Sequence, residues 1–449
     1  MRLSKHYFLA LIISISLLSF ISCDDGTPSP NISPNNTPSN NSNNSSTPNP
    51  EPNAELYKNI DDYVLKTPIE VAQSIDSLST YIVATATNDK EKTRAIYRWV
   101  TNNINYDAQG FFTKEYGDLS AENVLKTRKG VCEGYANLFE ALAQKAGLEV
   151  VKIGGYAKGY GFASGTNINS NEPNHAWNAV KIDGQWQLVD STWGAGYLND
   201  QKQFVKRFQD HYFLTPPSEF IVDHFPEDNK WQLLNTPISM QDFQQLVSLK
   251  PPFFENHLSL VSHKQSLITA NESLEVSLSA PMDVLVLASL NQNGQNLDES
   301  LTFIQREGNL YKILVHFPKT GQYELNIFAG KDIKQSFDQA LEYTINATSV
   351  SAGVVAFPQT FATFTQNNAF LYSPLEKDIE VGKQYEFKLK VPNANNVAIF
   401  NGSSPINLQK NGEYFEGVII PNHGDFGVFA SFSGTNDRQY FQLLKYQTN

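Results

Sequence analysis

The chain has 449 residues, of which 34 are basic and 46 acidic, giving a formal net charge of −12. Hydrophobic residues make up 41% and aromatic residues 12%, which supports sizeable buried cores and excludes a wholly disordered chain. The acidic balance argues against nucleic acid as the main partner, because phosphate backbones select basic faces. With two cysteines, the chain can build neither a disulfide framework nor a cysteine-rich zinc site.

The N-terminus has the pattern of an export signal. Arg2 and Lys5 precede an apolar run, residues 9–21, which is too short to span a bilayer comfortably. The run ends just before Cys23, in a pattern that resembles a bacterial lipoprotein cleavage site; an ordinary cleaved signal is the alternative. We therefore expect residues 1–22 to be a signal peptide and Cys23 to carry lipid. The mature protein would then be anchored to the bacterial cell envelope, at the outer membrane or the cell surface.

Residues 23–53 form a segment dominated by Asn, Pro, Ser and Thr. A segment of this composition cannot bury enough apolar surface to fold by itself. The sequence therefore predicts a disordered tether, which would hold the folded part of the chain away from a membrane.

Residues 54–250 mix helix and strand signals and are expected to form one α+β domain. Three helix starts stand out, at Thr67, Asn88 and Cys132. Thr67 and Asn88 are each followed three residues later by glutamate, which is typical of a helix N-terminus. Gly147 is the predicted end of the third helix, because glycine readily adopts the left-handed conformation that ends helices.

From about residue 251 the pattern changes to the strict alternation of half-buried strands. Leu274, Val276 and Leu278, for example, alternate with polar residues. This pattern predicts two β-sandwich domains of the immunoglobulin-like type, at residues 251–348 and 349–449. One larger β domain is the alternative.

A weak internal repeat supports the reading of two related β domains. Tyr311 aligns with Tyr414, and Tyr323 aligns with Phe426, at one constant offset. Self-similarity at a fixed period is the sequence signature of a repeated structural unit.

Cys132 is the candidate nucleophile. If Cys23 carries lipid, Cys132 is the free thiol that remains, and a leftover cysteine in an exported protein is a candidate reactive thiol. Cys132 also stands at a predicted helix start, where the positive end of the helix dipole favours the thiolate over the thiol. The alternative is a small buried residue that only packs the helix.

A predicted β-hairpin brings a histidine and an aspartate together. Two strands, residues 175–182 and 185–190, flank the Asp-Gly pair at 183–184, which is typical of a two-residue hairpin turn. Such a turn fixes the register, so Asp190 lies diagonally from His175 on the same face, at about 7–8 Å. The carboxylate can therefore orient the imidazole, although a purely structural His–Asp pair is the alternative. A Gly/Tyr-rich patch before the hairpin, residues 154–156 and 159–161, is expected to be a loop at the rim of the cleft.

Together these residues match the pattern of a nucleophile, a base and a residue that orients the base. Cys132 would attack a carbonyl carbon, His175 would hold and later donate the thiol proton, and Asp190 would fix the imidazole. The backbone N–H of Cys132 would meet the developing oxyanion. We expect neither a metal site nor a cofactor, because no two histidines have ligand spacing on a helix.

A second oxyanion donor is needed, and three aromatic residues are candidates for it or for the wall of the cleft. They are Tyr106, Trp177 and Trp193. For Tyr106 and Trp193, packing against neighbouring side chains is the alternative role.

Three segments resemble the motifs of the transglutaminase-like superfamily: GVCEGYANLF at 130–139, NHAWN at 174–178 and DSTW at 190–193. Residues 211–221 and 224–226 further resemble the branch that contains kyphoscoliosis peptidase and a fungal cytokinesis protein. The resemblance implies a papain-like α+β fold, with the cysteine on a helix and the histidine and aspartate on adjacent strands. Superfamily members include protein cross-linkers, amide hydrolases, proteases and proteins that have lost activity.

These observations lead to one leading functional expectation and one alternative. The leading expectation is a thiol enzyme that acts on amide bonds of protein or peptide substrates through an acyl-enzyme, with hydrolysis favoured over cross-linking. Its expected contacts are the substrate and, through the lipid, a membrane, with no nucleic acid. The alternative is an inactive transglutaminase-like scaffold or binding module at the cell surface.

Overall fold

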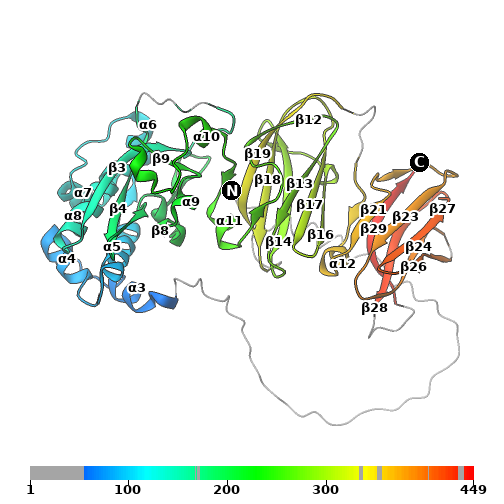
Figure 1. Cartoon of the computed structure of the whole chain (residues 1–449), viewed down its shortest axis with the longest axis horizontal. Helices are drawn as coiled ribbons and strands as arrows, with labels where there is room; N and C mark the ends of the chain where they lie inside the picture. The colour runs from blue at the N-terminus through cyan, green and yellow to red at the C-terminus, as the bar shows by residue number, and fades with distance from the viewer. Residues whose placement is uncertain are drawn as a thin grey trace, which may run out of the picture.

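The computed structural model describes residues 55–166, 168, 172–332, 337–350, 356–402, 404–432 and 439–449. The predicted signal peptide, Cys23 and the predicted tether lie outside these residues. Figure 1 shows three units in a row, an α+β unit followed by two β units. Among the described residues, no helix is both long and apolar enough to cross a membrane.

The α+β unit places its main helices against one antiparallel sheet. The sheet has the order β8–β5–β4–β3–β9. Its strands are β3 (Val150–Ala157), β4 (His175–Ile182), β5 (Gln185–Val189), β8 (Phe213–Thr215) and β9 (His224–Pro226). The helices are α3 (Lys58–Val64), α4 (Ile75–Ile82), α5 (Asp89–Asn103), α6 (Ala108–Thr113), α7 (Ala121–Thr127), α8 (Cys132–Lys145), α9 (Pro217–Phe220) and α10 (Met240–Gln245). Two short pairs complete the unit: β1 (Asn105–Tyr106) with β2 (Lys129–Gly130), and β6 (Gly196–Leu198) with β7 (Phe204–Lys206).

Helix α8 lies at the centre of this unit, against α4, α5, β3 and β4. One face of α8 is fully buried, because Tyr135, Leu138, Phe139 and Leu142 recur at helical spacing. The helix begins at Cys132, as predicted, and Gly147 follows its end with a φ of 79°. The core therefore fixes the position of the helix that carries the candidate nucleophile.

The three predicted helix starts have different outcomes. Asn88 caps α5 as expected, because its side chain accepts a hydrogen bond from the N–H of Glu91. The prediction at Thr67 is wrong: a short 3-10 turn follows, and α4 begins at Ile75. Ser74 has an extended backbone, and its side chain accepts a hydrogen bond from the N–H of Ser77. Ser74 therefore caps α4 and separates this helix from the preceding 3-10 turn.

The predicted hairpin has the expected turn and register. Asp183 and Gly184 both have positive φ, at 51° and 79°, as a two-residue turn with right-handed strand twist requires. Ile182 pairs with Gln185, and the register continues to the pair Asn178–Val189. The return strand ends there rather than at residue 190, since β5 shifts register at Val189 where it pairs with β8.

The first β unit is a sandwich of two sheets. One sheet has the order β10–β19–β18–β14–β15 with β12 added on β19, and the other has the order β11–β13–β17–β16. The strands are β10 (Ser248–Leu249), β11 (Ser259–Leu260), β12 (Leu267–Ala270), β13 (Ser273–Ser279), β14 (Leu285–Gln292), β15 (Gln295–Asn296), β16 (Thr302–Glu307), β17 (Leu310–His316), β18 (Gly321–Gly330) and β19 (Asp338–Ala347), with helix α11 (Pro251–Glu255) after β10. Since β10 already pairs with β19, this sheet begins slightly before residue 251.

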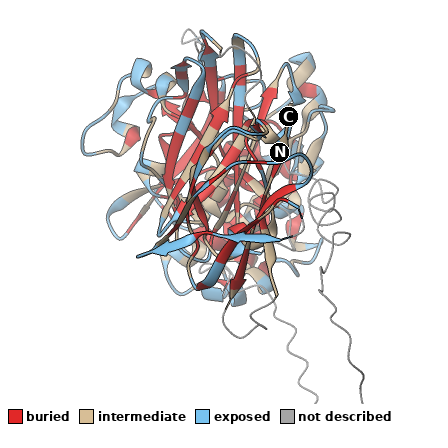
Figure 2. Ribbon diagram, turned by 90° about the vertical axis from the view of Figure 1, so that its right-hand side faces the viewer, coloured by how far each residue is buried: buried red, intermediate tan, exposed pale blue. Residues whose placement is uncertain are grey.

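The second β unit repeats this arrangement strand by strand. Its sheets have the orders β20–β29–β28–β24–β25, with β22 added on β29, and β21–β23–β27–β26. The strands are β20 (Gln359–Thr360), β21 (Phe370–Ser373), β22 (Asp378–Ile379), β23 (Tyr385–Lys390), β24 (Ala394–Phe400), β25 (Pro405–Asn407), β26 (Gln409–Asn411), β27 (Tyr414–Ile419), β28 (Phe426–Phe432) and β29 (Phe441–Thr448), with helix α12 (Ala362–Gln366) after β20. The chain thus has two separate sandwiches rather than one larger β domain, and Figure 2 shows buried residues along their strands.

The sequence repeat is correct at one position and shifted by one residue at the other. Tyr323 and Phe426 both lie in the sandwich cores, near the starts of β18 and β28. Tyr311 is buried and pairs with Leu278, whereas its buried counterpart is Phe415, which pairs with Leu389. A shift of one residue along a strand moves a side chain to the other face, so Tyr414 points away from the core of the second sandwich, whereas Tyr311 fills the core of the first.

Candidate active site

Cys132 is held at a fixed point by backbone pairing on both sides. Strand β1 runs parallel to β2 and pairs Tyr106 with Gly130, and the N–H of Asp107 donates to the carbonyl of Gly130. Val131 has an extended backbone, and Cys132 then opens α8. The side chain is half-buried, as a nucleophile that must meet substrate requires, and is a free cysteine.

His175 lies at the first position of β4 and is 8% exposed. Its Nε2 is 2.7 Å from Oδ2 of Asp190, and Cys132 is the other side chain whose interaction with the ring favours the charged imidazolium. Burial lowers the pKa of His175, but the charge and hydrogen bonds of Asp190 and Cys132 outweigh burial and raise it to about 10. The imidazolium form of His175 is therefore favoured at neutral pH, so this ring carries a proton next to the Cys132 sulfur.

Asp190 is completely buried and accepts several hydrogen bonds. One oxygen, Oδ1, accepts from the backbone N–H groups of Thr192 (2.7 Å) and Trp193 (3.1 Å). The other, Oδ2, faces His175. Burial alone would raise the pKa of Asp190, but His175 and His224 outweigh burial and hold that pKa well below its usual value. Asp190 thus sits in a tight turn after β5, not in the strand, and its carboxylate is fixed by that turn.

The structure places the three aromatic candidates differently. The Tyr106 ring lines the cleft next to Cys132, and burial together with the Cys132 charge raises the pKa of its hydroxyl, which stays a hydrogen-bond donor. Trp193 also lines the cleft, with its ring 5.3 Å from that of His175. Trp177 is 1% exposed and packs behind His175, and it is absent from the described lining of the cleft.

One buried histidine was missed as a site residue by the sequence reasoning. His224, on β9, has its Nε2 3.0 Å from Oδ2 of Asp190 and its Nδ1 2.6 Å from Oδ1 of Asp223. Its segment resembled a motif, but no sequence spacing connects β9 with the hairpin. Only the sheet order, in which β9 pairs with β3 and β3 with β4, brings His224 to Asp190.

A cleft of about 1330 Å³ opens above Cys132 and His175. The predicted Gly/Tyr-rich loop is only half correct: residues 159–161 line the rim, whereas residues 154–156 belong to strand β3. The rim also includes residues of the first sandwich. The sandwich residues that line it are Lys250, Pro251, Pro252, Asp338 and Gln339. The first sandwich is therefore one wall of the candidate active site.

Polar and aromatic contacts hold the α+β unit against the first sandwich beside the cleft. Arg207 Nη2 is 2.5 Å from Oδ2 of Asp338, and both residues line the cleft. The ring of His211 stacks on Phe254 of α11, with centroids 4.9 Å apart. These contacts connect the α+β unit with the sandwich next to the candidate site.

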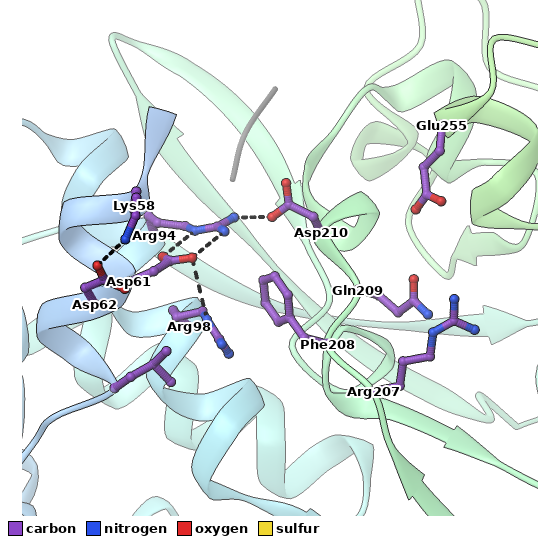
Figure 3. Close-up of a pocket in the computed structure, with 11 residues that line it drawn as sticks. Lys58, Asp61, Asp62, Arg94, Arg98, Arg207, Phe208, Gln209, Asp210 and Glu255 are labelled. Carbon is purple, nitrogen blue, oxygen red and sulfur yellow. Dashed lines mark hydrogen bonds and ion pairs between the residues drawn. The ribbon is translucent and has the colours of Figure 1, made fainter. Parts of the chain in front are cut away.

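A second, smaller pocket lies between α3, α5 and the segment around Asp210 (Figure 3). Its volume is about 430 Å³, and its described lining has neither cysteine nor histidine. Arg94 lies at its base with a 1% exposed side chain, 2.8 Å from Asp61 and also paired with Asp210. Each basic residue of the lining is paired with a carboxylate: Lys58 with Asp62, Arg94 and Arg98 with Asp61, and Arg207 with Asp338 outside the pocket. This pocket is therefore a structural ion-pair junction rather than a second reactive centre.

Three histidine and carboxylate groups lie close enough together to suggest a metal site. His175, Asp190 and His224 have ligand atoms within 4.8 Å of one another, all buried. The distances of 2.7 and 3.0 Å from Asp190 to the two rings are those of charge-assisted hydrogen bonds. The cluster therefore fits a proton-sharing network.

Comparison with known proteins matches the α+β unit and the first sandwich to known families. Residues 76–191 match the transglutaminase-like superfamily, and residues 240–358 match the KY-like, immunoglobulin-like domain. The chain therefore contains a transglutaminase-like α+β domain followed by an immunoglobulin-like all-β region, and the predicted resemblance and fold class are confirmed.

Relatives combine these features at modest identity. Kyphoscoliosis peptidase of Mus musculus is 33% identical over 288 residues, which cover 64% of this chain and 42% of the relative. Cytokinesis protein 3 of Schizosaccharomyces pombe is 25% identical over 216 residues, 47% of this chain and 24% of the relative. The chain thus spans less than half the length of these relatives. A crystal structure of a TGase is 19% identical over 38% of each chain with a TM-score of 0.20, a likeness too distant to support an argument.

Proposed function

Starting from a transglutaminase-like domain joined to a KY-like, immunoglobulin-like domain, we propose that the protein is a thiol enzyme that acts on amide bonds of proteins or peptides. The observation that carries the proposal is the position of His175, between the Cys132 thiol and the buried carboxylate of Asp190. This is the order of nucleophile, base and orienting group that acyl transfer requires.

The first half-reaction forms an acyl-enzyme. The Cys132 sulfur attacks the carbonyl carbon, and the thiol proton resides on His175, through the ring nitrogen that Asp190 does not use. The negative charge that develops on the carbonyl oxygen is met by the N–H of Cys132 and by the Tyr106 hydroxyl. When the carbon–nitrogen bond breaks, His175 gives the proton to the leaving amine, and a thioester remains on Cys132.

The second half-reaction releases the acyl group. Water attacks the thioester carbon and gives a proton to His175, the carbon–sulfur bond breaks, and the thiolate and a carboxylic acid result. An amine in place of water would give cross-linking instead. We favour hydrolysis, because the cleft is open to solvent and water can reach the thioester. Cross-linking would instead need a thioester shielded from water and a binding site for the amine.

The shape of the cleft supports a polypeptide substrate. A volume of about 1330 Å³ exceeds that of a typical small-ligand pocket, and the lining extends from Cys132 to Lys250 of the first sandwich. A substrate polypeptide lying across Cys132 would contact both units, so the enzyme could recognise substrate residues on either side of the scissile bond.

We further propose that the enzyme works outside the cytoplasm on a lipid anchor. The basis is the pattern of residues 1–22, the cysteine that follows and the tether-like composition of residues 23–53. Cys23→Ala should move the protein from the membrane fraction to the soluble fraction of the envelope. An unchanged membrane fraction would argue against the anchor.

The test of the activity uses the thiol itself. In a chain with Cys23→Ala, Cys132 is the remaining thiol, and its alkylation rate should follow a pH profile that changes in His175→Ala. Cys132→Ala should abolish amide cleavage and amine incorporation against a library of envelope proteins and peptides. Cys132→Ser is the matched control for volume, since it keeps a hydroxyl of similar size but a much poorer nucleophile.

The alternative function is an outcome of the same experiment. A slow alkylation that does not respond to pH or to His175→Ala would mean a sequestered thiol. If Cys132→Ala also kept the protein's partners and cellular role, the inactive scaffold would be the correct description, with the two sandwiches as the binding part.

A further inference from the structure

Asp190 lies between two imidazole rings rather than one. Its Oδ2 is 2.7 Å from Nε2 of His175 and 3.0 Å from Nε2 of His224. On the far side of His224, Nδ1 is 2.6 Å from Oδ1 of Asp223, whose other oxygen is 3.3 Å from the Tyr212 hydroxyl. The chain of contacts therefore runs from His175 through the fully buried Asp190 and His224 to Asp223, which lines the cleft again.

Counting protons along this chain gives the state of His224. A neutral imidazole carries one N–H and presents one bare nitrogen. Each ring nitrogen of His224 faces a carboxylate oxygen, and two acceptors cannot bond each other without a proton between them. Asp190 already accepts from three other donors, and Asp223 accepts from the Tyr212 hydroxyl, so both acids act as acceptors. With both acids as carboxylates, the arrangement that satisfies every contact has a proton on both nitrogens of His224.

The surroundings of His224 favour this charge. The Phe220 ring stacks on it at 4.0 Å, and the rings of Trp193 and Trp177 lie at 4.4 and 5.2 Å. Aromatic faces attract a cation, more strongly where water is excluded, and the His224 side chain is fully buried. The titratable groups that face or influence it from neighbouring elements are Asp190, Asp223, His175, His211 and Tyr212.

We propose that His224 is a positioning residue that is held as an imidazolium, shares the carboxylate of Asp190 with His175, and so limits how strongly Asp190 retains the proton of His175. This inference deepens the proposed thiol chemistry and rests on it for its catalytic meaning. The charge state of His224, by contrast, is a property of the fold and can be tested without any substrate.

The consequence for catalysis follows from electrostatics. A positive charge at His224 offsets part of the negative charge of Asp190, so it lowers the pKa of His175 relative to a site without it. His175 must release its proton to the leaving amine, and an imidazolium held too tightly would be a poor acid. Asp190 and Asp223 in turn raise the pKa of His224 despite its burial, which keeps the charge in place.

The first measurement is the protonation of His224 by nitrogen-15 NMR of histidine-labelled full chain. Its signals are assigned by their loss in His224→Gln. We expect protons on both ring nitrogens throughout pH 6–8. A neutral ring in this range would overturn the proposal, whatever the enzyme does with substrates.

The second measurement is the pH profile of Cys132 alkylation in matched variants. His224→Gln keeps a donor toward Asp190 but removes the charge, and losing a positive charge favours protonated forms of neighbouring groups. The acid limb of the profile should therefore shift upward by roughly one pH unit, which slows alkylation about tenfold on that limb. Tyr212→Phe removes one uncharged contact with Asp223 and should leave the limb in place.

Asp223→Asn provides a second route to the same state if His224→Gln does not fold. The amide can donate to Nδ1, so His224 no longer needs a second proton, and the limb should move in the same direction by a smaller amount. An equal shift in Tyr212→Phe, or no shift in either charge variant, would contradict the proposal. If these shifts are observed but the enzyme turns over no substrate, the result counts against the proposed function and leaves the proposed role of His224 standing.

Discussion

The two sandwiches repeat one topology but have different neighbours. Leu314 of β17 pairs with Glu275, and Val418 of β27 pairs with Glu386, so the two apolar residues occupy equivalent positions. Leu314 packs against the core of the second sandwich, whereas Val418 is 54% exposed. Two apolar residues at equivalent strand positions are thus packed or exposed according to whether another unit of the row lies against them (Figure 1).

The same comparison separates the sandwiches by function. The first contacts the α+β domain and lines the cleft through Lys250 and Asp338. The second packs on the first through Phe303 and Gln305, and none of its described residues lines the cleft. The two sandwiches thus share a fold, and their positions along the row decide which of them borders the cleft.

The largest effect is expected where the two sandwiches meet. Phe303 is 2% exposed and its ring lies 5.5 Å from Phe357 and 5.7 Å from Phe364. Phe303→Ala should lower the free energy of unfolding by about 3–5 kcal/mol, because it leaves a cavity between the units. Val418→Ala, on the exposed equivalent face, should change it by less than about 0.5 kcal/mol. Urea denaturation measures both, and equal losses would show that the two faces do not differ.

A pH series should distinguish the α+β domain from both sandwiches. In the folded state the pKa of His175 is raised to about 10, so the stability it contributes is fully present below about pH 6.5 and is lost as pH rises toward 10. The pKa of Asp190 is lowered, so its contribution is present above about pH 4 and is lost below that. Burial lowers the pKa values of His263 and His316 of the first sandwich. These two histidines therefore change the stability of the sandwich only at pH values below about 6.5.

The transition of the α+β domain should therefore shift to lower urea between pH 7 and pH 9, while the transitions of the sandwiches stay nearly constant. Tryptophan fluorescence reports the α+β domain selectively, because the five tryptophans of the chain, at positions 99, 177, 186, 193 and 231, all lie within it. His175→Gln should remove this part of the pH dependence. A shift of the same size in the variant would sink the assignment to His175.

The smallest effect should come from the wall of the cleft. Lys250 lies at the N-cap position of α11 in the first sandwich, and Phe361 lies at the N-cap position of α12, the equivalent place in the second; neither side chain makes a capping hydrogen bond. Lys250→Ala should reduce kcat/KM for polypeptide substrates by up to about fivefold, equivalent to about 1 kcal/mol, and should spare short substrates. Phe361→Ala should leave kcat/KM per folded enzyme unchanged. Equal effects of both variants would mean that the wall does not contact substrate.

Much of the candidate site could be predicted from local sequence. The Asp-Gly turn sets the register of β4 and β5, which brings Asp190 within reach of His175, and α8 begins at Cys132. Both features depend on residues close together in the chain. The failures have local causes as well. Ser74 caps a helix that Thr67 was expected to start, and a shift of one residue makes Phe415, not Tyr414, the equivalent of Tyr311 in the second sandwich.

Local sequence was sufficient to predict the hairpin, the helix start at Cys132 and the change from an α+β to an all-β region. These features follow from turn geometry, capping and hydrophobic periodicity, which act over a few residues. Only the tertiary structure decided that His224 shares Asp190 and that the first sandwich forms a wall of the cleft. Both depend on sheet order and on packing between distant segments, where burial and charge pairing are set by neighbours that no local pattern specifies.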